Sequence, residues 1–60
     1  MKIQVTNCTD TLYWYYKYIG MIFDVIRVEQ DGTYWVREPN QYQAKNFILR
    51  QDAVQIKEPP

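Results

Sequence analysis

The chain has 60 residues, and its seven basic and seven acidic side chains cancel to a formal net charge of zero. A chain of this length makes one domain with a small core. The neutral balance disfavours both a strongly basic nucleic-acid-binding protein and an acidic mimic of DNA. With one cysteine and no histidine, the chain lacks an intramolecular disulfide and the usual ligands of structural zinc, so we expect no metal and no cofactor.

The sequence also lacks the patterns that direct a chain to membranes or out of the cell. It has no apolar run long enough to span a bilayer, and no charged segment followed by an apolar one at its start. We therefore expect a cytoplasmic protein without a membrane partner.

The first third of the chain predicts one strand and one long loop. Residues 2–5, KIQV, alternate polar and apolar side chains, which predicts a half-buried strand with Ile3 and Val5 inward. Residues 6–11, TNCTDT, are turn formers and predict a loop. The stretch LYWYYKYIG, residues 12–20, follows in the same long connection and holds five aromatic side chains.

The middle of the chain predicts a β-hairpin. Residues 21–30, MIFDVIRVEQ, and residues 33–38, TYWVRE, are two strand-like runs around Asp31-Gly32. A two-residue loop would set Arg27 opposite Val36. We favour a three-residue loop over 30–32, with Gly32 left-handed in a bulge.

The favoured loop defines the pairing between the two strands. It sets Val28 opposite Tyr34, Ile26 opposite Val36, and Arg27 opposite Trp35 on the outer face. A second bulge or bend over residues 24–26 would also turn Phe23 and Val25 inward. 

The last third predicts two more strands. Residues 39–43, PNQYQ, form a turn that begins with proline, and residues 44–50, AKNFILR, form a strand. Residues 51–53, QDA, make one helical turn before a final strand over 54–57, VQIK. Residues 58–60 form a disordered tail that cannot pair in a sheet because it ends in two prolines.

This order of elements is all-β and resembles the SH3-like small barrel. The stretches GMIFDVI, DGTYWVRE and FILRQDAVQI carry the resemblance, chiefly through Gly20, Asp31-Gly32 and Val54. The resemblance implies a single domain over residues 1–57, a five-stranded, partly open barrel with a long first loop of the RT type. Free-standing barrels of this size are similar to small proteins encoded by bacteriophages and prophages.

Two of the three elements with which SH3 domains bind proline-rich peptides are absent here. The first strand has no tyrosine, and Arg50 and Ala53 fall where that family has a proline and a tyrosine. We therefore do not expect proline-rich recognition, because a fold does not carry its function with it.

We expect no enzymatic activity. The chain has no histidine, and Cys8 lies beside Asp10, whose negative charge would raise the pKa of a thiol. Cys8 is expected to be a partly buried loop residue. The carboxylates of Asp24, Asp31 and Asp52 look like solvated strand or turn residues. 

The aromatic side chains of the first loop have two interpretations. They either complete an undersized core or, in part, form a recognition surface. If the segment is extended, successive side chains face opposite sides, so some rings must face solvent. The first hypothesis is a non-catalytic module that binds an unidentified protein. If the module is phage-encoded, that partner would be a protein of the host cell. The residues assigned to that surface are Tyr13, Trp14, Tyr15, Tyr16, Tyr18 and Trp35.

The alternative hypothesis is a binder of single-stranded nucleic acid. In the favoured hairpin, Arg27, Trp35 and Arg37 share the outer face, with Lys45 from the next strand. Rings on such a platform stack on bases while cations contact phosphates. An exposed aromatic patch also favours self-association, so we expect a monomer or a weak homodimer.

Overall fold

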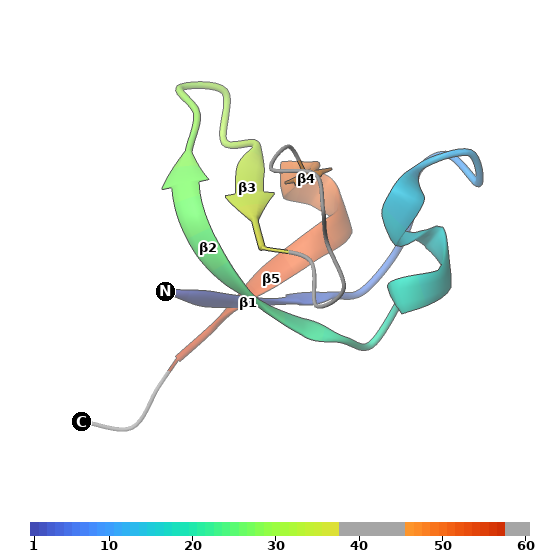
Figure 1. The fold of residues 1–60 in the computed structure, drawn as a ribbon, viewed down its shortest axis with the longest axis horizontal. Helices are drawn as coiled ribbons and strands as arrows, with labels where there is room; N and C mark the ends of the chain where they lie inside the picture. The colour runs from blue at the N-terminus through green and yellow to red at the C-terminus, as the bar shows by residue number, and fades with distance from the viewer. Residues whose placement is uncertain (38–45, 58–60) are drawn as a thin grey trace.

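The structure is a computed structural model that describes residues 1–37 and 46–57. Its five strands form one antiparallel sheet in the order β4-β3-β2-β1-β5 (Figure 1). The strands are β1 (Lys2–Val5), β2 (Ile22–Val28), β3 (Tyr34–Val36), β4 (Asn46–Ile48) and β5 (Ala53–Ile56), and two short 3-10 helices are η1 (Trp14–Tyr18) and η2 (Arg50–Asp52). The prediction of an all-β chain is confirmed for the described residues.

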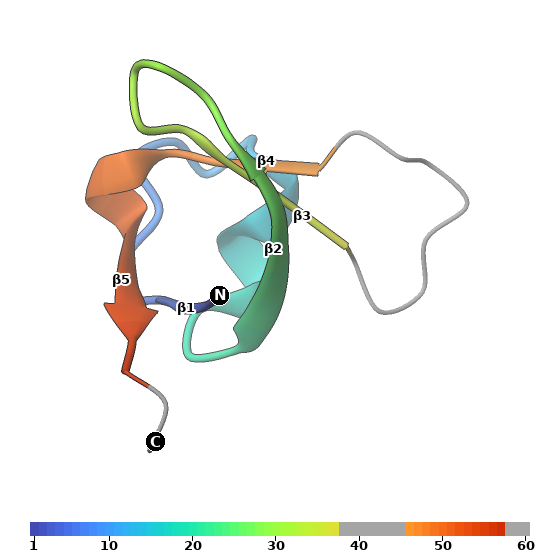
Figure 2. The same ribbon diagram turned by 90° about the vertical axis from the view of Figure 1, so that its left-hand side faces the viewer.

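The long strand β2 curves and takes part in both halves of the sheet, as Figure 2 shows. Its first half pairs with β1, which in turn pairs with β5. Its second half pairs with β3, which pairs with β4. One bent strand therefore holds together two small groups of strands around a common core.

The bend in β2 coincides with a bulge between Val25 and Arg27. The predicted inward turn of Phe23 and Val25 is confirmed, since Phe23 is buried and Val25 is partly buried against the core. The predicted pairing of Ile26 with Val36 is wrong, because Val25 takes that place and Ile26 is exposed. The extra residue at the bulge reverses the inward and outward alternation of the strand.

The loop between β2 and β3 has the predicted three-residue form. The backbone N–H of Glu29 donates to the carbonyl oxygen of Thr33 at 2.9 Å, and Gly32 has a φ of +93°. Opposition of Val28 to Tyr34 and of Arg27 to Trp35 is therefore confirmed.

The two glycines allow a matched test of this turn. Both have positive φ, +96° at Gly20 and +93° at Gly32, which costs a residue with a side chain about 1–2 kcal/mol. An added Cβ at Gly32 would lie 2.7 Å from Cδ of Arg50, whereas nothing lies within 4 Å at Gly20. We expect Gly32→Ala to lower the free energy of unfolding more than Gly20→Ala, as measured by urea denaturation. Equal losses would show that the Arg50 side chain moves aside freely.

The core lies between the two halves of the sheet. The predicted inward direction of Ile3 and Val5 is confirmed, since both are fully buried. The other buried hydrophobic residues are Tyr15, Phe23, Val36, Ile48 and Ala53. Tyr15 comes from the first loop, so that loop supplies part of the core.

Several predicted boundaries differ from the structure. The helical turn before the last strand is present, but it spans Arg50–Asp52 instead of 51–53, and β5 starts at Ala53. The turn over 39–43, Lys45 and the tail over 58–60 lie outside the described residues. No helix in the described part of the chain is long and apolar enough to cross a bilayer.

Candidate protein-interaction surface

The first loop, between β1 and β2, does not have the extended form assumed for its aromatic segment. Residues Trp14–Tyr18 form the 3-10 helix η1, so the alternation of neighbouring side chains does not apply there. Figure 1 shows this loop and η1 together at one end of the molecule, away from the C-terminus.

The buried carboxylate of Asp52 anchors this loop to η2. Asp52 is fully buried, so its expected exposure to solvent is wrong. Its side-chain oxygens accept hydrogen bonds from the N–H of Thr9 at 3.0 Å, the hydroxyl of Thr9 at 2.8 Å and the hydroxyl of Tyr15 at 2.5 Å. Its carbonyl oxygen accepts the N–H groups of Thr6 and Asn7 at 2.9 and 3.2 Å. One residue of η2 therefore holds four residues of the first loop.

Hydrogen bonds stabilise the charge of Asp52. Burial raises the pKa of its carboxyl, but the hydrogen bonds from Tyr15 and Thr9 outweigh burial and hold the pKa below its usual range. The pKa of Tyr15 is raised by burial and by its hydrogen bond to Asp52. The Tyr15 hydroxyl therefore stays protonated and donates to Asp52, while it accepts the N–H of Leu49 at 3.3 Å.

The remaining aromatic side chains of the first loop pack on the core and on β4. The Trp14 indole Nε1 donates to the carbonyl oxygen of Phe47 at 2.5 Å, and the Trp14 ring meets Phe23 edge-on at 5.6 Å. Tyr18 meets Phe23 at 6.1 Å and Tyr13 meets Phe47 at 5.2 Å. These contacts favour the structural interpretation for most of the rings.

Only part of the predicted aromatic surface faces solvent. Tyr15 is fully buried, whereas Tyr16 is 46% exposed. Two aliphatic residues that the sequence interpretation missed lie with it in the first loop, Leu12 at 89% and Ile19 at 48% exposure. We call Leu12, Tyr16 and Ile19 the first-loop surface. Asp10 holds Leu12 in its turn, because its carboxylate accepts the Leu12 N–H at 2.9 Å.

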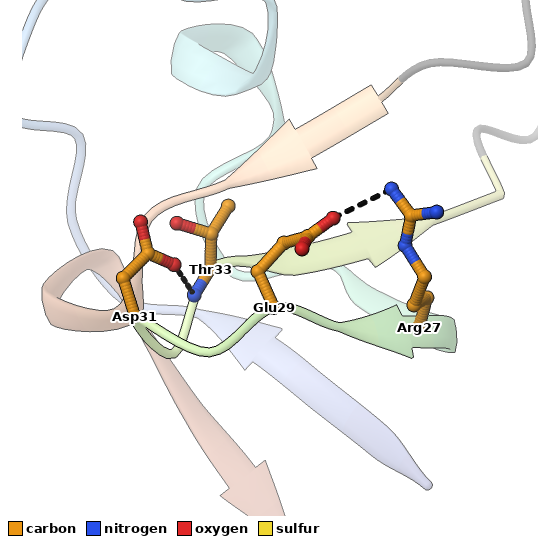
Figure 3. Close-up of polar contacts among 4 residues, drawn as sticks. All are labelled: Arg27, Glu29, Asp31 and Thr33. Atoms are coloured by element: carbon orange, nitrogen blue, oxygen red, sulfur yellow. Dashed lines mark hydrogen bonds and ion pairs between the residues drawn. The ribbon is translucent and has the colours of Figure 1, made fainter.

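The second predicted surface is a row of side chains on the outer face of β2, β3 and β4. Arg27 is opposite Trp35, and Trp35 is opposite Phe47. The guanidinium carbon of Arg27 lies 5.4 Å from the centre of the Trp35 ring, a cation–π contact. Figure 3 shows the Arg27 guanidinium bound to Glu29, at 2.6 Å. Glu29 therefore offsets the positive charge that a phosphate would require.

The same view shows a hydrogen bond at the hairpin tip. The carboxylate of Asp31 accepts the N–H of Thr33 at 2.9 Å, which Figure 3 shows beside the ion pair. Arg37 is exposed just after β3, and Lys45 lies outside the described residues. The structure therefore joins Arg27 and Trp35, but it does not show the full set of four predicted residues together.

Phe47 lies between the row on the hairpin and the buried rings of the first loop, and it was not predicted to have a role. It lies opposite Trp35 in the sheet and contacts Tyr13 of the first loop. The alternation of the NFI stretch was a usable signal, since buried Asn46 and Ile48 leave Phe47 on the other face. No local signal pointed to Asp52, whose partners are 37 or more residues away.

The described residues contain no group of three His, Cys, Asp or Glu side chains that could hold a metal ion. Cys8 is partly buried, as expected, and its thiol donates to the carbonyl oxygen of Asp10 at 3.0 Å.

Comparison of the chain with protein-family models, curated proteins and solved structures found no match.

Proposed function

We propose that this chain is a non-catalytic protein-interaction module, built as an SH3-like small barrel, that contacts its partner with the first-loop surface. The sharply bent β2, the antiparallel strand order and the helical turn immediately before β5 support this type of barrel. The resemblance of the sequence pattern to small phage-encoded SH3-like proteins is the reason to propose a host protein as the partner.

The observation that carries the proposal is an exposed apolar group on an immobilised loop. Leu12 is 89% exposed, although residues on both sides of it are hydrogen-bonded into the fold through Asp10 and Asp52. A loop that is already ordered loses little conformational entropy when it binds, so its apolar contacts contribute more fully to affinity. Apolar and tyrosine side chains without net charge suit a protein surface better than a phosphate backbone.

Binding measurements with surface variants test this proposal. The partner is first captured from nuclease-treated lysate and purified, and then titrated by calorimetry against the wild type and the variants Leu12→Ser and Tyr16→Ser. Truncating a central interface residue costs about 1–2 kcal/mol, so we expect roughly tenfold weaker binding for each variant. Val28→Ser is the control, because the exposure of Val28, 45%, is close to that of Tyr16, but Val28 lies at the hairpin end of β2.

The outcome is decided by the contrast between the variants. Unchanged affinity in both loop variants, with thermal stability like that of the wild type, would place the binding surface elsewhere. An equal loss in the Val28→Ser control would indicate a general effect and would also contradict the proposal.

The second candidate function is binding of single-stranded nucleic acid by the outer row of the hairpin. The contact of Arg27 with Trp35, continued by Phe47, is the observation that favours it. The same capture experiment separates the two functions, since material lost on nuclease treatment would favour this row. Binding to an oligonucleotide should then weaken as salt rises.

A further inference from the structure

Strand β5 is one of the two edges of the sheet, and its backbone pattern is defined by its pairing with β1. The N–H of Thr6 donates to the carbonyl oxygen of Asp52 at 2.9 Å. In an antiparallel ladder the residues that exchange hydrogen bonds with the neighbouring strand alternate. Ala53 and Gln55 therefore direct their N–H and C=O groups away from β1, and Lys57 continues the alternation. Among the described residues, no hydrogen bond reaches these groups of Ala53 and Gln55.

The opposite edge of the sheet, at β4, is covered in a different way. There the Trp14 indole binds the carbonyl oxygen of Phe47, and the Tyr15 hydroxyl binds the N–H of Leu49. Covering an edge in this manner prevents another strand from adding to it. The edge at β5 has no such cover in the described part of the chain, so it is the edge that can accept a strand.

The side chains of β5 show which strand would fit. Val54 pairs with Gln4 and Ile56 with Lys2, so both aliphatic residues lie on the outer face of the sheet. Val54 is 48% exposed and Ile56 is partly exposed. Gln55 lies between them, exposed on the other face, while the methyl group of Ala53 reaches the core.

We propose that β5 pairs antiparallel with β5 of a second copy of this chain, about a twofold axis at Gln55. The two Gln55 residues then face each other and exchange both of their backbone hydrogen bonds. Ala53 pairs with Lys57 of the second copy in the same way. The two sheets join into one continuous sheet. The first-loop surface of each copy remains free to bind another protein.

The pattern of β5 fits a second copy because it is self-complementary in this register. Val54 lies directly opposite Ile56 of the second copy, and the reverse pair repeats the contact, so four aliphatic side chains meet on one face. The two Gln55 amides meet on the other face. Over positions 53–57 no like charges oppose each other across the axis, and a chain with zero net charge does not repel its copy.

Gln55→Pro is the direct test, because it removes an N–H that the ladder with β1 does not use. Proline is tolerated on an edge strand, so the variant should fold while its dimer is lost. Because interfaces of this size are weak, sedimentation equilibrium is measured up to about 0.5 mM protein. We expect a wild-type dimer and at least tenfold weaker association in the variant. A monomeric wild type, or a variant that dimerises equally well while its thermal stability is unchanged, would overturn the proposal.

Disulfide cross-linking tests the register, and it remains informative if the proline variant fails to fold. In a Cys8→Ser background, Gln55→Cys places two thiols on facing residues, within the distance that a disulfide requires. Lys57→Cys is the matched control, because the twofold axis sets those two positions far apart. Rapid oxidation to a covalent dimer in the first variant alone supports the proposal. Equal cross-linking of both variants, or faster cross-linking through position 57, would contradict it.

Discussion

Asp52→Asn is expected to lower the free energy of unfolding by about 3 kcal/mol, because hydrogen bonds to a buried charged group are worth roughly 1.5–3 kcal/mol. The amide that replaces the carboxylate has one oxygen for the donors of Thr9 and Tyr15, and it places an NH₂ group against the others. Urea denaturation followed by tryptophan fluorescence measures the loss. A change of less than 1 kcal/mol would show that the anchor of the first loop is not centred on this residue.

The same residue makes stability depend on acid. The folded protein holds the pKa of Asp52 below its usual value of 3.8. The ionised carboxylate therefore makes its full contribution to the free energy of unfolding above pH 3.8. The contribution is lost as pH falls through the lower, folded pKa. The free energy of unfolding of the wild type should therefore fall as pH falls below about 3.8, and that of Asp52→Asn should change less over the same range. Asp31 also has a lowered pKa, through its hydrogen bonds with Thr33. Asp31→Asn is therefore the control, and it should retain most of the loss of stability that the wild type shows at acid pH.

Tyr15 makes stability depend on pH at the alkaline end, where the free energy of unfolding falls as pH rises. Burial raises its pKa above the usual value of 10.0, so the folded state favours the protonated phenol. Its contribution is present below pH 10 and is lost as pH rises further. Tyr15→Phe should remove this alkaline loss of stability and retain the ring contacts. If both variants keep the wild-type pH profile, the hydrogen bond between Tyr15 and Asp52 does not contribute to stability.

Trp14→Ala should destabilise the fold itself, and not only a binding surface. Removing a packed tryptophan side chain costs about 3–5 kcal/mol, and here the ring contacts Tyr15, Tyr18 and Phe23. A domain of this size has little stability to spare, so we expect a largely unfolded chain at 25 °C by circular dichroism.

Two further variants, one at Trp14 and one at Leu12, separate the effects on folding from the effects on binding. Trp14→Phe keeps an aromatic ring but loses the bond to the carbonyl oxygen of Phe47, so we expect a folded protein destabilised by about 1 kcal/mol. Leu12→Ser, at an exposed position, should leave stability unchanged. A folded Trp14→Ala protein that has lost its partner would instead make Trp14 an interface residue.

The sequence was informative where neighbouring residues decide the structure. The alternation of KIQV and the Asp31-Gly32 turn predicted β1 and the central hairpin, because short-range patterns define strand faces and turn types. The bulge or bend in β2 was predicted over residues 24–26 and is found there, but the pairing of Ile26 with Val36 was wrong, because a shift of one residue leaves the local composition unchanged.

The candidate site was less predictable because it depends on contacts between distant parts of the chain. The aromatic segment was considered in an extended form, which could not separate exposed Tyr16 from buried Tyr15. The exposed aliphatic Leu12 was not considered. The carboxylate of Asp52 looked like an ordinary turn residue. Its partners are donors 37 to 45 residues earlier in the sequence, and no local pattern reports such a contact.

The position of Asp52 has a consequence for the order of folding. Its bonds to Thr9 and Tyr15, like the pairing of β1 with β5, close most of the chain into a loop, whereas the hairpin of β2 and β3 needs only near neighbours. Closing long loops slows folding, so we expect the hairpin to form early and the anchor late. Until the anchor forms, the rings of the first loop remain exposed, and during that interval the chain is most prone to aggregate.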